Sequence, residues 1–394
     1  MSTPKARLSN PQRLARLLGV AAVCIAGTCA AQPSASDDGR EILTIDHYVA
    51  HVSTVPAMAG ETAQLYVRER VAAGTLARAA ALEDRVVLFV HGAGTPAEVA
   101  FDVPHEDYSW MAYLAEAGYD VFSMDMTGYG RSTRPTPMND ACNLSPEQQQ
   151  ALIPDVLQAP CEPSHPGELT TIESDWDDID AVVEHLRALR GVERVSLIGW
   201  SLGGPRAGGY AARHPEKVWR IVLLAPAYAA DSPAERAPAA AGASGAAFNT
   251  QSHADFTANW NRQVGCADQY DPETAAAVWA EMLASDPVGA TWGAGVRRAP
   301  RTAVWGWNRD VVSGTLTPML LVAAVHDAQV AADRVRLLYE HLGAAQKVLL
   351  DLGCASHNAM WERAHTILFD ASLEWLRFGT VGGMDRGIVQ RGYE

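Results

Sequence analysis

The chain has 394 residues, a formal charge of −15 at pH 7 and 48% hydrophobic residues. Its length suits one large α/β domain with an insertion or two small domains, and its composition is ordinary for a globular protein. The acidic balance argues against nucleic acid as a partner, because phosphate backbones attract basic surfaces.

The first 31 residues have the layout of a secretory signal peptide. Four basic residues precede an apolar run at 17–26, and small residues follow as far as Ala31. We expect cleavage between Ala31 and Gln32, which would change the formal charge from −15 to −19 because the segment holds four basic and no acidic residues. The run is short for a membrane span, so the mature chain is expected to be secreted or periplasmic with no stable span. A retained N-terminal anchor is the alternative.

Four cysteines remain after that cleavage, and an even number in an exported protein favours disulfides. Three pairings are possible. We favour Cys142 with Cys161, which closes a short loop and leaves Cys266 to pair with Cys354. Four buried free thiols are the alternative.

Taken in chain order, the elements begin with two strands at 42–52 and 62–71, an expected antiparallel pair. Strands and helices then alternate, and the strands are uniformly apolar, as in a parallel sheet buried on both faces. These strands are expected at 85–90, 120–124, 195–199, 221–224, 319–325 and 347–352. Apolar residues at helical spacing over 176–189 predict an amphipathic helix that covers the sheet.

Two stretches interrupt this alternation. Residues 134–170 hold many prolines without a sustained period, which predicts an ordered loop excursion. Residues 226–317 contain helical patterns and five tryptophans, which predict an inserted helical cap; most of these tryptophans are expected to pack the cap, with one or two facing a ligand. The core is therefore assigned to 32–225 and 318–378, with a partly disordered, Gly-rich tail at 379–394.

The strongest local motif is Gly-Trp-Ser-Leu-Gly at 199–203, which follows an apolar strand and precedes a helix-compatible run. A serine on such a strand-to-helix turn projects its hydroxyl above the sheet edge, and the small glycines avoid clashes within the turn. The helix N-terminus can supply backbone N–H groups to a developing oxyanion. We therefore interpret Ser201 as a nucleophile.

A serine nucleophile needs a base, and in this strand order the acid and the base come later in the chain. Asp327 follows the strand at 319–325 and His357 follows the strand at 347–352. We assign His357 as the base and Asp327 as its orienting acid. The alternative acid is Asp231, and His326 is a less favoured base because His357 lies on a loop that can reach over the sheet edge.

A second motif, Val-His-Gly-Ala-Gly at 90–94, ends another apolar strand. Its glycines let a backbone N–H approach a substrate oxygen, so the amides of Ala93 and Leu202 are the expected oxyanion hole. His91 is expected to orient this loop through hydrogen bonds. The motif at 125–132 is expected to shape a turn, since it lacks the lysine of a phosphate-binding loop.

Together these motifs resemble the α/β-hydrolase superfamily over residues 85–378, closest to the branch of esterases, perhydrolases, epoxide hydrolases and haloalkane dehalogenases. Epoxide hydrolases and dehalogenases of that branch use an aspartate nucleophile, which Ser201 replaces here. The resemblance implies an α/β fold with a mostly parallel central sheet, helices on both faces and a cap. It also implies hydrolysis of small-molecule or polymeric carboxylic esters through an acyl-enzyme intermediate, without a cofactor or a metal.

Other activities of the same fold stay open at this point. Amide, lactone and carbon–carbon hydrolysis use the same three side chains, and a slow-turnover binding protein could retain them.

Overall fold

The computed structural model describes residues 41–76, 82–236 and 246–393. The predicted signal peptide lies outside the described residues, as does most of the Ala- and Gly-rich stretch that opens the insertion. Within the described residues, no helix combines the length and the apolar character that crossing a bilayer requires.

A nine-stranded sheet forms the centre of the fold, in the order β1-β2-β4-β3-β6-β7-β11-β12-β13. The predicted N-terminal pair is present, because β1 runs antiparallel to β2 and β2 antiparallel to β4, and the remaining neighbours are parallel. The strands are β1 (Ile42–Val52), β2 (Thr62–Ala72), β3 (Val86–Val90), β4 (Asp120–Met124), β6 (Val195–Trp200), β7 (Val218–Leu224), β11 (Met319–Ala324), β12 (Lys347–Leu352) and β13 (Arg386–Arg391).

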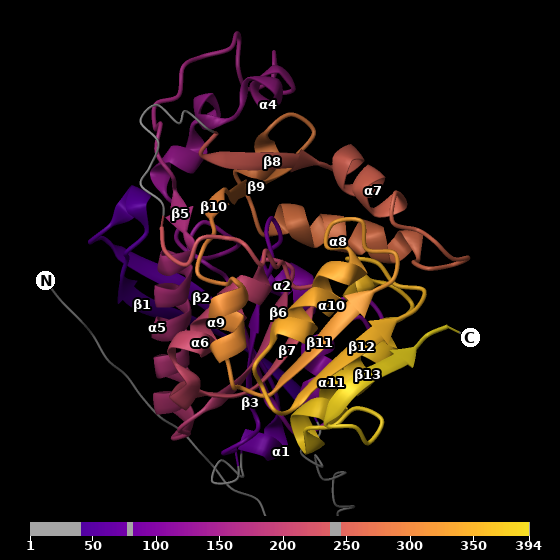
Figure 1. The fold of residues 1–394 in the computed structure, drawn as a ribbon. Coiled ribbons are helices and arrows are strands. Elements are labelled where there is room, and N and C mark those ends of the chain that lie inside the picture. Colours follow the sequence, from indigo (N-terminus) through magenta and orange to yellow (C-terminus); the bar gives the residue numbers. More distant parts are fainter. Residues whose placement is uncertain (1–40, 77–81, 237–245, 394) are drawn as a thin grey trace, which may run out of the picture. The chain divides into compact units, whose positions relative to one another are not determined.

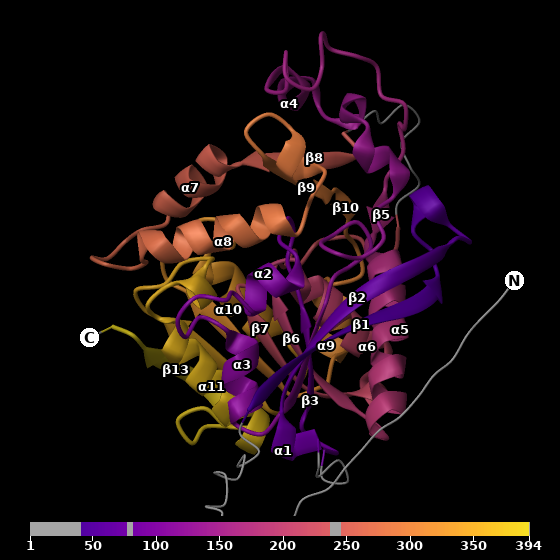
Figure 2. The same cartoon turned by 180° about the vertical axis from the view of Figure 1, so that it is seen from behind.

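Both faces of this sheet are covered, which explains why its central strands are apolar throughout. In β3, Leu88 and Val90 belong to one core cluster, whereas Val87 and Phe89 belong to the other. The first face is covered by α5 (Ile172–Arg190), η5 (Gly204–Gly208), α6 (Gly209–Arg213), α9 (Arg309–Gly314) and α10 (Ala332–His341). The second is covered by α2 (Ala97–Phe101), α3 (Trp110–Glu116) and α11 (His365–Phe378) (Figures 1 and 2).

The long helix α5 shows how the sequence sets these elements. Thr171 and Ser174 form a reciprocal capping box, and Glu173 lies in the first turn, where a negative charge is favourable. The helix ends at Gly191, whose φ of 65° is accessible to glycine without strain. Short elements complete the core: η1 (Pro56–Met58), α1 (Ala73–Leu76), η6 (Pro215–Lys217) and η8 (Ala359–Trp361).

The insertion between β7 and β11 differs from the predicted helical cap, because it also contains strands. It contains α7 (His253–Asn261), α8 (Pro272–Ala284) and η7 (Gly289–Thr291), but also an antiparallel ribbon of β8 (Phe248–Ser252) and β9 (Val296–Pro300). A further short strand, β10 (Thr302–Ala303), pairs with β5 (Thr170–Thr171). The ribbon escaped prediction because its strands are short and rich in polar residues. Figures 1 and 2 both show β8, β9 and α8 over the end of the sheet at which α2 lies. This is the end formed by the carboxyl ends of the parallel strands, and it is called the sheet edge below.

The five tryptophans of the insertion are all buried, each no more than 7% exposed: Trp260, Trp279, Trp292, Trp305 and Trp307. Trp260 stacks on Tyr270, and its Nε1 donates to Glu362. Packing therefore accounts for these rings, as expected for side chains that bury a large area each.

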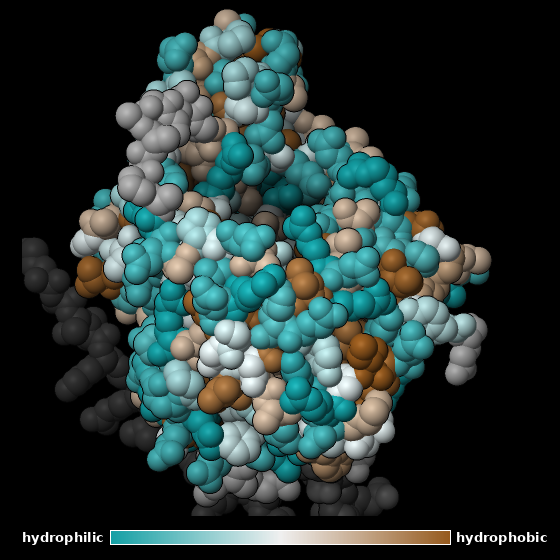
Figure 3. All heavy atoms as spheres, in the orientation of Figure 1, coloured by the Kyte–Doolittle hydropathy of each residue, from teal (hydrophilic) through white to brown (hydrophobic). Residues whose placement is uncertain are grey.

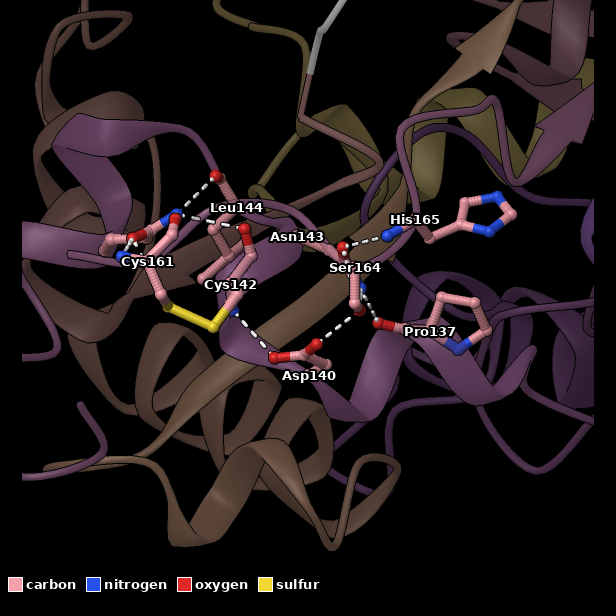
Figure 4. Close-up of a disulfide and its surroundings, with 9 residues drawn as sticks. Pro137, Asp140, Cys142, Asn143, Leu144, Cys161, Ser164 and His165 are labelled. Atoms are coloured by element: carbon pink, nitrogen blue, oxygen red, sulfur yellow. Dashed lines mark hydrogen bonds between the residues drawn. A yellow bond between two sulfur atoms is a disulfide. The ribbon is translucent and has the colours of Figure 1, made fainter.

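The excursion at 134–170 is an ordered loop built around a disulfide (Figure 4). It contains η3 (Thr136–Asn139), η4 (Ala141–Asn143) and α4 (Pro146–Gln150). Cys142 is bonded to Cys161, and the side chain of Gln149 bridges the two cysteines by donating to both of their carbonyls. Cys266 is bonded to Cys354, so the structure contains the pairing that the short first loop favoured.

The C-terminal tail, predicted to be partly disordered, contains an ordered strand. Residues 386–391 form β13, which extends the sheet by pairing in parallel with β12. Ile388 and Val389 lie in this strand, but the glycines and arginines around them hide the pattern. The sheet thus ends at residue 391 and not at the expected boundary of 378.

Candidate active site

Ser201 lies in the turn between β6 and the helical segment that follows it. Its φ is 57°, a left-handed conformation that is uncommon for residues other than glycine. The turn is fixed by backbone bonds, because the Ser201 amide donates to Leu224 (3.0 Å) and its carbonyl accepts from Gly204 (2.9 Å) and Ala227 (2.8 Å). A strained conformation held this firmly is typical of functional sites.

The glycines of the motif permit this turn by close approach. A Cβ on Gly199 would meet the carbonyl oxygen of Gly203 at 2.5 Å, and one on Gly203 would overlap the carbonyl oxygen of Val90. Any larger side chain would push β6, the turn and β3 apart. The motif therefore has the structural context that was expected of it.

His357 and Asp327 are in direct contact. The Nδ1 of His357 lies 2.8 Å from Oδ2 of Asp327, and both side chains are almost fully buried. The other carboxylate oxygen, Oδ1, accepts from the amides of Gln329 and Val330 at 2.7 Å each. Because a carboxylate accepts, Nδ1 carries a proton, and in the neutral imidazole Nε2 then presents its lone pair. Among the described residues, Nε2 has no hydrogen-bond partner.

His357 lies beside the residue that precedes the serine. Trp200 donates from Nε1 to the carbonyl of His357 at 2.8 Å, and the two rings have centroids 5.4 Å apart. The Ser201 hydroxyl makes no hydrogen bond within the described part of the chain. The structure thus joins the base to the acid and sets the base next to Trp200, while the bond from the hydroxyl to Nε2 is not formed.

The two alternative residues lie elsewhere. Asp231 is exposed and follows β7 at the start of the insertion. His326 has its ring against Gly265, where a Cβ would overlap the imidazole, and its backbone amide donates to Ala355. Neither is paired with His357, so Asp327 is the carboxylate that orients the imidazole.

The expected oxyanion hole has two unused amides. Neither Ala93 nor Leu202 donates a backbone hydrogen bond to any residue that the structure describes. Gly92 brings the Ala93 loop to the serine, since a Cβ on Gly92 would lie 2.9 Å from the Cβ of Ser201. Ala93 is an exposed residue and Leu202 a partly exposed one.

Comparison with known proteins settles the family. The family model described as alpha/beta hydrolase fold matches residues 85–363, more than half of the chain. The chain belongs to the α/β-hydrolase family. Its fold is similar to that of a thermophilic esterase from Thermogutta terrifontis, with a TM-score of 0.50 and 16% identity over 84% of this chain and 98% of that one. A monoacylglycerol lipase from Paleococcus ferrophilus gives a TM-score of 0.47 and 19% identity over 75% of this chain and 94% of that one.

One important residue of this hydrolase was missed by sequence analysis. Arg206 is completely buried, and its Nε donates to Asp175 at 2.7 Å. Its Nη1 donates to the carbonyls of His91 and Gly92, at 3.0 Å each. The arginine follows Ser201 by five residues, so it ties the serine turn to the loop that carries the Ala93 amide. An arginine in a Gly-rich turn is the signal that could have indicated it.

His91 has the orienting role expected of it in this hydrolase. It is fully buried, its Nδ1 lies 2.7 Å from the Gly92 carbonyl, and its Nε2 accepts from the Met126 amide at 3.1 Å. Burial, together with the positive charge of Arg206, lowers the pKa of His91 well below its usual value. A neutral imidazole locked by both nitrogens is not free to act as a base.

The motif at 125–132 also shapes a turn, as expected. Asp125 is buried and accepts from the amides of Ala97 (2.8 Å) and Arg131 (2.9 Å), and the Ser132 hydroxyl donates to the Asp125 carbonyl. These bonds fix the start of α2 against the end of β4.

The insertion of this hydrolase touches the loops that carry Asp327 and His357. Gln263 accepts from the Ala328 amide at 3.1 Å, next to Asp327. Cys266 is bonded to Cys354, three residues before His357. Buried Glu362 accepts from Ser356, Trp260 and Gln269, and burial raises its pKa. The described residues contain no group of three metal-ligating side chains.

Proposed function

We propose that this protein is an exported serine hydrolase that cleaves carboxylic esters, with Ser201 as nucleophile, His357 as base and Asp327 as the acid that orients it. The observation that carries the proposal is the buried pair of His357 and Asp327, 2.8 Å apart, beside a serine held at φ 57° on a strand-to-helix turn.

The proposed reaction has two steps. In the first, the Ser201 oxygen attacks the ester carbonyl while Nε2 of His357 takes its proton, and the imidazolium then returns that proton to the departing alkoxide. In the second, water attacks the acyl-enzyme ester by the same route and releases the acid and free Ser201. The amides of Ala93 and Leu202 are proposed to bind the oxyanion that forms in each step.

The proton transfer requires that the Ser201 hydroxyl first form a hydrogen bond to Nε2 of His357. The hydroxyl of Ser201 is free of other hydrogen bonds among the described residues, so rotation about its side-chain bond costs little. Catalytic hydrogen bonds are often long without substrate and tighten when it binds.

Export is proposed from two independent features. The first is the signal-like N-terminal segment, and the second is the pair of disulfides, which persist in oxidising compartments and are rare in the cytosol. A periplasmic or secreted location accounts for both.

A substrate panel tests the reaction class. The mature chain would be assayed with 4-nitrophenyl esters of acetate, butyrate and octanoate, with the matching 4-nitroanilides and with γ-butyrolactone. We expect turnover of at least one ester and little turnover of the anilides, because an alkoxide leaves more readily than an amide nitrogen. Hydrolysis of anilides or the lactone alone would overturn the ester assignment and leave a hydrolase of another bond.

A further inference from the structure

Arg297 is a cation in the insertion that pairs with no carboxylate among the residues that the structure describes. It lies in β9, and its Nε donates to Oε1 of Gln251 on β8 at 2.9 Å. Among the described residues, no aspartate or glutamate pairs with its guanidinium. Its two Nη nitrogens make no hydrogen bond to these residues, yet they are not sealed from solvent.

The neighbouring arginines are satisfied in a different way. Arg298, the next residue, is buried and donates to Asp286 from two nitrogens, at 2.7 Å and 3.0 Å. Arg134 also faces Asp286, at 3.9 Å, and donates to backbone carbonyls. Asp286 therefore serves two arginines, and the described part of the chain offers Arg297 no carboxylate.

Arg297 points at the loop that carries the expected oxyanion amide. A Cβ on Gly94 would overlap Nη1 and the guanidinium carbon of Arg297 and would lie 2.5 Å from Nη2, so the planar group rests on the backbone of residue 94. Gly94 adjoins Ala93, and Gly92 contacts Ser201. Figure 3 shows a hollow in this face of the molecule, with hydrophilic residues around it, where Figure 1 places β9 and β10.

The guanidinium keeps its charge at this position. Burial lowers the pKa of Arg297 to about 10, which leaves it protonated at neutral pH. A half-buried charge without a counter-ion is costly, whereas Arg readily binds carboxylates through two parallel N–H bonds. The free Nη pair is thus a suitable receptor for an anion that enters from solvent.

We propose that the preferred substrates are esters that carry a carboxylate, which the free Nη1 and Nη2 of Arg297 bind while the ester lies at Ser201. The inference rests on the proposed esterase function and adds a substrate class to it. Arg297 would determine specificity, because it binds a part of the substrate that does not react.

Matched pairs of substrates test this inference. One pair is 4-nitrophenyl hydrogen glutarate and its neutral methyl ester, with the carboxylate on the acyl side. The other is 4-acetoxybenzoate and its methyl ester, with the carboxylate on the leaving group. We expect a ratio of kcat/KM, charged over neutral, of about tenfold or more for at least one pair, falling at least about fivefold in Arg297→Gln.

Two further variants keep the test decisive. Arg301→Gln removes the same charge from an exposed residue just after β9 and should leave both ratios unchanged. Arg297→Lys keeps the charge but loses the fork, so its ratio should lie between those of wild type and Arg297→Gln. Equal ratios in wild type and Arg297→Gln would overturn the proposal, as would a wild-type preference for both neutral esters.

A binding measurement separates this proposal from the esterase function. Glutarate would be titrated by calorimetry into Ser201→Ala and into Ser201→Ala/Arg297→Gln. We expect the second protein to bind at least about tenfold more weakly, whether or not the wild type hydrolyses any ester. Equal affinity, or no binding to Ser201→Ala, would contradict anion recognition by Arg297 even if ester hydrolysis is established.

Discussion

The sheet edge and the insertion that lies over it differ in how one arginine of each is paired. At the sheet edge, Asp327 accepts three hydrogen bonds and His357 is held by it, and buried Arg206 has Asp175 as its counter-ion. In the insertion, Arg297 donates to the amide oxygen of Gln251, and its two Nη nitrogens make no hydrogen bond to any residue that the structure describes.

The difference separates the two tasks of the site. At the sheet edge, Asp327 and Nδ1 of His357 are bonded before substrate arrives, as expected for preorganised catalysis, whereas the Ser201 hydroxyl and Nε2 have no hydrogen bond to the described residues. A group that recognises substrate has to leave bonds open for it. On this view the sheet edge determines the chemistry, and the insertion determines which ester is used.

The largest effect is expected at the nucleophile. Ser201→Ala should lower kcat by about 10⁴-fold or more, because no acyl-enzyme can form. The hydroxyl bonds to no described residue, so the thermal midpoint should change little. Steady-state kinetics and thermal unfolding of the same preparation check both statements, and substantial turnover by this variant would exclude Ser201 as the nucleophile.

The orienting acid should have the next largest effect. Asp327→Asn is expected to lower kcat by about 10³-fold, since an amide no longer favours the Nδ1–H form of His357 or stabilises its cation. Asp231→Asn is the matched control, because Asp231 is exposed and follows β7, and its kcat should match the wild type. The reverse ranking of the two variants would transfer the role to Asp231.

Arg206 links the turn at Ser201 to the loop of His91 and Gly92, and its replacement should have an intermediate effect on activity. In Arg206→Met we expect kcat to fall by about 10–100-fold with a smaller change in KM, since the Gly92 and His91 carbonyls lose their donor. The unfolding free energy should fall by about 3 kcal/mol, because Asp175 is left buried without its partner. Chemical denaturation and initial rates measure the two effects separately.

The double variant Arg206→Met/Asp175→Asn distinguishes positioning from stability. Removing both charges should recover most of the stability but not the kcat. Burial raises the pKa of Asp175 to about 6, above its unfolded value. Loss of Arg206 raises the pKa of Asp175 further, because a positive charge no longer favours the carboxylate. The loss of stability in Arg206→Met relative to wild type should therefore grow as the pH rises above about 6 and shrink toward pH 4. Recovery of kcat together with stability would reduce Arg206 to a purely structural role.

The smallest effects on activity are expected from the disulfides. Replacing both cysteines of the 266–354 bond with serine should lower the free energy of unfolding by about 4–5 kcal/mol, and the same change at the 142–161 bond by about 3 kcal/mol. The first loss is larger because that bond links residues 88 positions apart, whereas the second links residues 19 positions apart. Loss of the 266–354 bond should also lower kcat several-fold, since Cys354 lies in the loop of His357. Equal kcat values for the two serine pairs would show that the insertion does not position the base.

The sequence indicated the sheet edge better than the insertion, for a physical reason. Parallel strands buried on both faces must be apolar throughout, and a serine on a tight turn needs small neighbours, so β6 and Gly199 could be recognised from local pattern. The ribbon of β8 and β9 is held by pairing between residues about 45 positions apart, as between Gln251 and Arg297, and local pattern contains no trace of such pairing. The strand β13 was missed likewise, since β12 and not its own composition stabilises it.

Local pattern also could not predict which arginine of the insertion lacks a carboxylate partner among the described residues. Arg297 and Arg298 are adjacent and identical in type, yet one has Asp286 and the other has none. That difference depends on which face of β9 meets the turn at residue 286, a property of the assembled fold.

The central claim is that Ser201 is activated by His357. The most direct test is labelling of the mature chain with a fluorophosphonate, followed by mass spectrometry of the peptides, in wild type and in His357→Ala. We predict one label per chain, on Ser201, at a rate that falls by at least about 10²-fold in His357→Ala. A Ser201 that stays unlabelled, or one that reacts equally fast without the imidazole, would contradict this account.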